Sequence, residues 1–154
     1  MEKSFPKISA KNLEGDSLEL PHDLDGILNI LIIAFKREQQ SLADEWIPYL
    51  EDYIKKNPQI AYYEIPTIHF SYLPLRWMID GGMRAGIADK KARQRTITLY
   101  INKKKFKKHL DVEDENTIYV FLINKDGKII WKTDGNITED KTHSLEETIG
   151  KILS

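Results

Sequence analysis

The chain has 154 residues, of which 41% are hydrophobic and 31% charged, and its formal net charge is −1. This composition excludes an intrinsically disordered protein, and the length suffices for a single domain, residues 1–154, with a sizeable core. The sequence contains no cysteine, which excludes disulfides, thiolate metal sites and a cysteine nucleophile.

The N-terminal region does not combine a basic start with a long apolar run, so we expect no signal peptide. The longest apolar stretch, Ile27–Phe35, is interrupted by Asn29. It is also far shorter than the roughly 20 residues that a membrane-spanning helix needs. We therefore expect a soluble, cytoplasmic protein.

The first part of the chain is predicted to contain a hairpin and a buried strand. Phe5–Ile8 and Ser17–Leu20 flank the turn-forming residues Asn12–Asp16. Ile27–Phe35 follows and is apolar at nearly every position, which is typical of a central strand covered on both faces.

A long helix is predicted next. Ser41–Asp44 has the pattern of a capping box in its acidic variant, and apolar residues then recur at helical spacing down to Lys56. Pro48 lies inside this helix, where it should remove a hydrogen bond and bend the axis.

The middle of the chain is predicted to form a strand and a loosely built helix. Ile60–Tyr72 has the composition of a strand, and Pro66 indicates that at least one side of it is an edge or a bulge. Pro74 is expected to begin a helix that Gly81 and Gly82 loosen.

The last part of the chain is predicted to complete a mixed sheet. A strand at Thr96–Ile101 and a short basic helix at Lys103–Leu110 precede the apolar run Ile118–Ile123. Asn124 to Gly127 is a hairpin signal that joins this run to the strand Lys128–Lys132, and Ser144–Leu153 is expected to form a covering helix. Strands alternating with helices predict an α/β sandwich, and the antiparallel hairpin makes its central sheet mixed.

This order of elements resembles the thioredoxin-like superfamily. In thioredoxins a buried strand ends in Phe, the first Cys of a Cys-x-x-Cys motif follows five residues later, and a kinking Pro comes eight residues after that Cys. Here Phe35 and Pro48 have those spacings, which places Gln40 and Ala43 at the two cysteine positions. The resemblance implies a three-layer sandwich with helices on both faces of a mixed sheet.

A second resemblance lies in the late hairpin. The block from Leu122 to Trp131 looks like the "FLID-KDG-KIVW" hairpin of thioredoxin-like and peroxiredoxin-like proteins. Their strand is entered by a cis-proline that faces the active thiols, and counting back from the turn places Ile118 at that position. Within the superfamily, Tyr119 to Leu122 with Ile130 and Trp131 looks most like the mitochondrial ATP synthase assembly-factor family, whose members help subunits into the membrane sector of the enzyme.

Gln40 and Ala43 supply no sulfur, so thiol–disulfide exchange and peroxide reduction are excluded for the isolated chain. Our leading hypothesis is a non-catalytic thioredoxin-like protein that binds a partner protein, as an assembly or chaperone-like factor. Its partner-binding face would include the vacated redox site, with help from Trp77 to Arg84, a glycine-interrupted insert that minimal thioredoxins lack. The candidate residues are Arg37, Gln40, Ser41, Ile118, Trp77, Met78, Met83 and Arg84. The alternative interpretation makes the insert residues ordinary core and cover.

The basic region supports a competing hypothesis. Residues 84–108 hold ten basic residues against Asp89 alone. This asymmetry could bind nucleic acid or an acidic membrane, or it could be the solvated face of a helix. The candidate anion-binding residues are Lys103, Lys104, Lys105, Lys107 and Lys108.

A third hypothesis, an enzyme with a non-thiol mechanism, has no supporting constellation of residues in the sequence. The four histidines, His22, His69, His109 and His143, are not paired at a metal-ligand spacing. We expect no metal centre and no cofactor.

Overall fold

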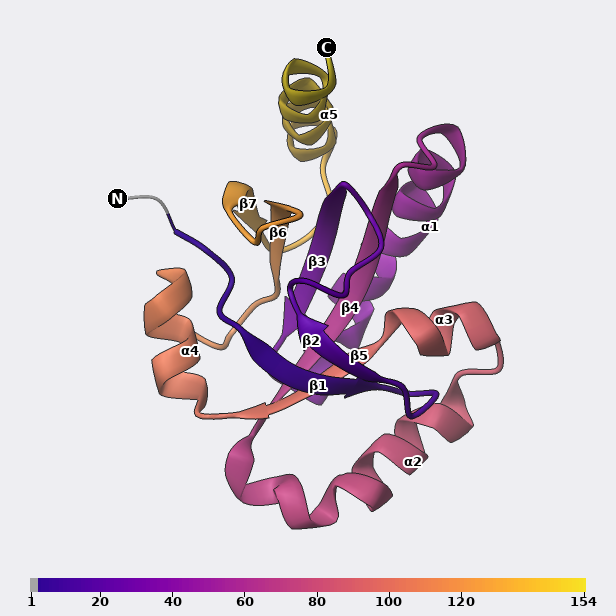
Figure 1. Cartoon of the computed structure of the whole chain (residues 1–154), viewed down its shortest axis with the longest axis vertical. Coiled ribbons are helices and arrows are strands. Elements are labelled where there is room, and N and C mark those ends of the chain that lie inside the picture. Colours follow the sequence, from indigo (N-terminus) through magenta and orange to yellow (C-terminus); the bar gives the residue numbers. More distant parts are fainter. Residues whose placement is uncertain (1–2) are drawn as a thin grey trace.

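The computed structural model of the protein describes residues 3–154, which form a mixed seven-stranded sheet with helices on both faces (Figure 1). The strands lie in the order β2-β1-β5-β4-β3-β6-β7. The strands are β1 (Ile8–Asn12), β2 (Ser17–Leu20), β3 (Leu28–Ala34), β4 (Ile60–His69), β5 (Ile97–Ile101), β6 (Tyr119–Asn124) and β7 (Ile129–Asp134). The helices are η1 (Arg37–Gln39), α1 (Gln40–Lys56), η2 (Phe70–Leu75), α2 (Arg76–Gly86), α3 (Lys90–Arg95), α4 (Lys103–Leu110) and α5 (Glu139–Leu153), with η1 and η2 of the 3-10 type.

The two central strands predicted from their apolar runs are confirmed. β3 pairs in parallel with β4 and antiparallel with β6, and alternate residues of β3 enter separate cores on opposite faces of the sheet. Ile30 and Ile32 pack in the core that α1 and α5 cover, whereas Leu31 and Ile33 pack in the core that α4 covers. This is the predicted three-layer arrangement, although Ile27 lies outside the strand and is exposed.

The capping box predicted at Ser41 is wrong. Helix α1 begins one residue earlier, at Gln40, directly after η1, and no side chain caps it. The preceding residue, Gln39, is buried, and its side chain stabilises the turn between β3 and α1. Its Oε1 accepts hydrogen bonds from the backbone N–H of Phe35 (2.9 Å) and of Lys36 (3.2 Å). The strand-to-helix junction is therefore fixed by a glutamine that bonds backward along the chain.

The middle segment differs from the prediction in three ways. β4 ends at His69 rather than at residue 72, Pro74 lies in η2, and α2 runs through both glycines without a break. Pro66 was predicted to mark an edge or a bulge. β4 is an interior strand, so it is not an edge, but its pairing is interrupted at this point: its ladder with β3 ends at Pro66, and its ladder with β5 begins at Thr67. Helix α3 was not predicted, and the Asp89 side chain caps it by accepting from the N–H of Ala92 at 3.0 Å.

The late hairpin is confirmed, with β6 and β7 antiparallel and Gly127 at a φ of +92°. Helix α5 begins at Glu139, five residues before the predicted start, because Thr138 caps it by accepting from the N–H of Lys141 at 3.2 Å. The first strand of the N-terminal hairpin is likewise shifted, to Ile8–Asn12. Among residues 3–154, no helix has the length and apolar character that crossing a membrane requires.

Candidate functional site

The positions that correspond to the redox site are filled by packed or hydrogen-bonded side chains. Ala43 and Ile118 are 2% and 0% exposed and belong to the same core cluster as Trp46. Gln40 is exposed, and its Nε2 donates to Asp44 Oδ1 at 2.8 Å and to Glu64 Oε1 at 3.2 Å. The structure thus brings the three vacated positions to the start of α1.

Glu64, on β4, is a residue of this region that the sequence interpretation missed. Burial raises the pKa of its carboxyl group, the hydrogen bond from Gln40 lowers it, and the nearby Asp44 carboxylate raises it. The one signal for it in the sequence is an acidic residue inside the apolar run from Ile60 to Ile65. A partly buried carboxyl group with these neighbours could exchange a proton.

The other two candidates near the start of α1 are exposed. Arg37 lies in η1 and Ser41 in the first turn of α1, and both side chains face solvent. Together with Gln40 they make a polar surface at the carboxyl end of β3.

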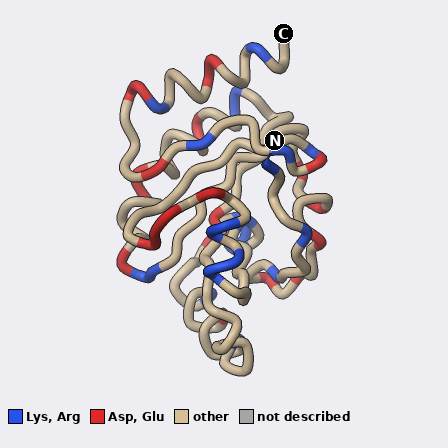
Figure 2. Tube along the Cα trace, turned by 90° about the vertical axis from the view of Figure 1, so that its left-hand side faces the viewer, with Lys and Arg blue, Asp and Glu red and all other residues tan. Residues whose placement is uncertain are grey.

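A second candidate surface lies on η2 and α2, which follow the carboxyl end of β4. Neither helix contains a buried residue. The exposed side chains of η2 and of the first turn of α2 are mostly large and apolar. We call these residues the apolar ridge: Phe70, Tyr72, Leu73, Leu75, Trp77 and Met78. Trp77 is 76% exposed, more than any other large hydrophobic side chain in the described part of the chain. Figure 2 shows this segment as a protruding lobe at the bottom of the molecule that is mostly uncharged, with Arg76, Asp80 and Arg84 as the charged residues of η2 and α2.

The apolar ridge is held on the sheet by polar contacts. Asp80 of α2 accepts hydrogen bonds from Thr98 Oγ1 (2.9 Å) and Tyr100 OH (2.7 Å), both on β5, and lies 3.5 Å from Arg76 Nε. The Arg76 guanidinium is also 5.0 Å from the centre of the Tyr100 ring, a cation–π distance. Burial and the hydrogen bond to Asp80 raise the pKa of the Tyr100 hydroxyl above its usual value.

Further ion pairs fix the segment that follows. Arg93 Nε contacts Glu14 Oε1 at 2.9 Å, and Arg84 contacts the other oxygen of Glu14 at 3.4 Å. Arg95 pairs with Glu51 of α1. Of the four insert residues proposed from the sequence, Trp77 and Met78 are therefore exposed on the ridge, Met83 is half-buried, and Arg84 is engaged with Glu14.

Ion pairs also neutralise part of the positive charge of the basic cluster predicted on α4. Lys103 and Lys107 lie 3.0 and 2.8 Å from the two carboxylate oxygens of Glu115, and these lysines lower the pKa of that carboxyl group. Lys104, Lys105 and Lys108 are exposed and form no ion pair with any residue in 3–154. The free basic charge of α4 is therefore carried by these three lysines.

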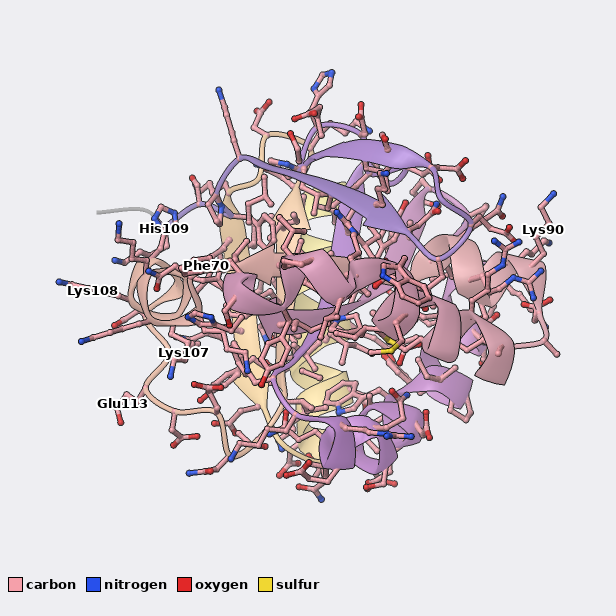
Figure 3. All side chains as sticks on the ribbon, turned by 90° about the horizontal axis from the view of Figure 1, so that it is seen from below. Phe70, Lys90, Lys107, Lys108, His109 and Glu113 are labelled. Atoms are coloured by element: carbon pink, nitrogen blue, oxygen red, sulfur yellow. The ribbon has the colours of Figure 1, made fainter. Side chains whose placement is uncertain are left out.

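The candidate surfaces lie at one end of the molecule. Viewed from below, η2 and α2 cross the middle of the face, with Phe70 beside the Lys107 and Lys108 end of α4 (Figure 3). An open depression beside α4 is lined by His69 at the end of β4, by the α4 region and by the acidic segment that follows it. Its lining residues are His69, Asn102, Lys103, Lys104, Lys107, Lys108, Asp111, Val112, Glu113 and Glu115. Lys90 lies at the opposite end of α2 in the same view.

Comparison with solved structures identifies the fold. The thioredoxin domain of a thiol-disulfide oxidoreductase from Bacteroides vulgatus is 18% identical, with a TM-score of 0.60 and 96% of each chain covered. A thiol:disulfide interchange protein DsbE from Chlorobium tepidum is 16% identical, with a TM-score of 0.59, 99% of this chain covered and 97% of the other. BsSco, described as a member of the Sco family of cytochrome c oxidase assembly proteins, is 12% identical, with a TM-score of 0.64 and coverage of 97% and 94%. The fold is therefore thioredoxin-like.

No curated protein matches the sequence. The profile of the family described as ATP10 protein matches residues 2–152, which is nearly the whole chain. The similar solved structures are described as thiol-disulfide oxidoreductases or as an assembly protein. This chain differs from an oxidoreductase in having no cysteine. The chain is a cysteine-free, thioredoxin-like member of the ATP10 protein family.

Proposed function

We propose that this protein is a non-catalytic assembly factor that acts by binding another protein. The observation that carries the proposal is how the positions that correspond to the redox site of thioredoxins are filled. Ala43 and Ile118 are packed into the core, and Gln40 is hydrogen-bonded to two carboxylates. The scaffold is retained, while the groups that thiol chemistry needs are absent. Membership of the ATP10 family supports a role in assembly.

The proposed contact surface is the polar start of α1. Arg37, Gln40 and Ser41 are exposed there, and η1 and the buried Gln39 side chain fix the backbone on which they stand. A rigid surface binds without first losing conformational entropy, which favours specific recognition. We further propose that the protein works in the cytoplasm.

Site-specific photo-crosslinking in the source cell tests this proposal. A photoreactive residue at position 41 is compared with one at position 55, because Ser41 and Lys55 are both exposed and stand near opposite ends of α1. Along a helix they are separated by roughly 20 Å. We expect position 41 to capture one discrete protein and position 55 to capture none. Equal capture at both positions, or capture of no protein at position 41, would contradict the proposal.

The alternative function is an anion-binding module for nucleic acid or an acidic membrane, and its nucleic-acid form has the smaller support. Two of the five lysines on which it depends, Lys103 and Lys107, are paired with Glu115. A nucleic-acid site needs several phosphate contacts from free cationic groups.

A further inference from the structure

We propose that the apolar ridge docks this protein on an anionic membrane surface, with lysines on both sides of the ridge contacting the lipid headgroups. The lysines are Lys104, Lys105 and Lys108 of α4 and Lys90 and Lys91 of α3. This inference concerns a different surface from the start of α1 and does not depend on the proposed protein contact.

The chemistry of the ridge matches a membrane interface. Trp and Tyr gather at the boundary between headgroups and hydrocarbon, because their rings are apolar at one end and polar at the other. Trp77 and Tyr72 are 76% and 52% exposed, and Phe70 and Met78 are each 50% exposed. Six exposed apolar side chains grouped on one segment are typical of an interaction site.

The charge around the ridge also favours an anionic surface. Between residues 65 and 88 the only acidic residue is Asp80, whose carboxylate is turned toward Thr98 and Tyr100 of β5. The lysines of α4 and Lys90 of α3 flank η2 and α2 at opposite ends, and Glu113 lies beyond Lys107 as seen from Phe70 (Figure 3). Basic residues beside an inserted apolar segment are attracted by the negative potential of acidic lipids.

The shape of the segment distinguishes a membrane from a protein partner. The ridge is on a convex lobe (Figure 2), whereas a helix from another protein is usually received in an apolar groove. A lipid surface yields to a convex ridge and requires no complementary cavity. The contacts of Asp80 with Thr98 and Tyr100 hold α2 on β5, and Arg84 of α2 contacts Glu14, so docking needs little ordering of the chain.

The tryptophans provide a direct assay with the full chain. Trp46 is completely buried and Trp131 is half-buried, so Trp77 should account for a fluorescence change on docking. We expect vesicles of phosphatidylcholine with phosphatidylserine to shift the emission to shorter wavelength and to sediment the protein. Vesicles of phosphatidylcholine alone should bind far less, and added salt should weaken binding to the acidic vesicles. Trp77→Phe should abolish the fluorescence shift while leaving sedimentation largely intact.

Two sets of charge reversals distinguish the effect of the lysines beside the ridge from the effect of net charge. Lys104→Glu, Lys105→Glu and Lys108→Glu together should lower vesicle affinity by at least on the order of 100-fold, since each lysine near an acidic surface contributes roughly a fivefold factor. The control, Lys55→Glu, Lys56→Glu and Lys151→Glu, makes the same change in net charge. Its residues are exposed near the C-terminal ends of α1 and α5, so it should change affinity only a few-fold.

A double variant, Leu73→Glu with Trp77→Glu, tests the apolar contribution; it should fold, because both side chains are exposed, and should fail to sediment. Equal loss of affinity in the two lysine sets, or no binding of the unmodified chain to acidic vesicles, would overturn the proposal. Capture of one discrete protein by a photo-crosslinker at position 77, without vesicle binding, would make the ridge a protein interface instead. The outcome at position 41 is independent of these results, so the two proposals can fail separately.

Discussion

Replacing Asp80 with alanine should free α2 from the sheet without unfolding the sheet itself. Asp80 accepts two hydroxyl hydrogen bonds, from Thr98 and Tyr100, and pairs with Arg76. Each hydrogen bond to a charged acceptor contributes about 1.5 kcal/mol, and the Arg76 pair at 3.5 Å adds only a few tenths. The total is about 3 kcal/mol, or roughly a 100-fold larger opening constant for α2.

Native-state hydrogen exchange measures this local opening. Since α2 contains no buried residue, its amides should exchange roughly 100-fold faster in Asp80→Ala, while the amides of β3 and β6 keep their protection. Asp52→Ala is the matched control, because Asp52 pairs with Lys56 on the exposed surface of α1 and should change little. Unchanged exchange of α2, or equal acceleration in β3 and β6, would refute the assignment of Asp80 as the residue that holds the ridge.

Three further substitutions test the packing and electrostatics of the site. Ile118→Ala should lower the free energy of unfolding by about 3 kcal/mol in denaturant titrations, because the side chain is fully buried; a loss below about 1 kcal/mol would mean that it does not fill the core. The pKa of Glu64 is raised in the folded state, so ionisation of this group opposes folding as pH rises through the usual glutamate range. Glu64→Gln should therefore stabilise the protein at neutral pH and lose that advantage in acid; the reverse pH dependence would contradict the assigned shift. The pKa of Glu115 is lowered in the folded state, so its contribution to stability is present at neutral pH and lost as pH falls through the folded-state pKa. Glu115→Gln should lower the free energy of unfolding by less than about 1 kcal/mol at neutral pH and should not change it in acid. Denaturant unfolding at both pH values measures this difference.

The parts of the fold that the sequence predicted best are those in which burial dominates. The apolar runs that form β3 and β6, and the Gly127 turn after β6, have few alternative arrangements. The helix starts were harder to predict, because several side chains compete to satisfy the first N–H groups. At α1 the buried Gln39 fixes the junction, whereas the sequence favoured Ser41.

The candidate surfaces were only partly predictable, because the exposure and pairing of their side chains depend on how the helices pack. The aromatic and β-branched residues before Tyr72 favour a strand, so the exposed start of the ridge at Phe70 was assigned to the sheet. Trp77 and Met78 were identified because they lie in a glycine-interrupted segment that the resemblance to minimal thioredoxins marks as an insert. The acidic residues from Asp111 to Glu115 follow α4 directly in the sequence, which indicates that they can balance its lysines. Which lysines pair with Glu115 depends on how α4 packs.

The central claim is that this thioredoxin-like chain works by binding a protein at the start of α1. Native affinity capture of the tagged full chain from the source cell measures this most directly, with the stoichiometry of each co-purifying protein determined. We expect one protein in stoichiometric yield, lost in the double variant Arg37→Glu with Ser41→Glu and retained in Lys55→Glu, because all three side chains are exposed and only the first two lie on the proposed surface. Recovery of no protein in stoichiometric yield, or equal recovery with both variants, would contradict the account.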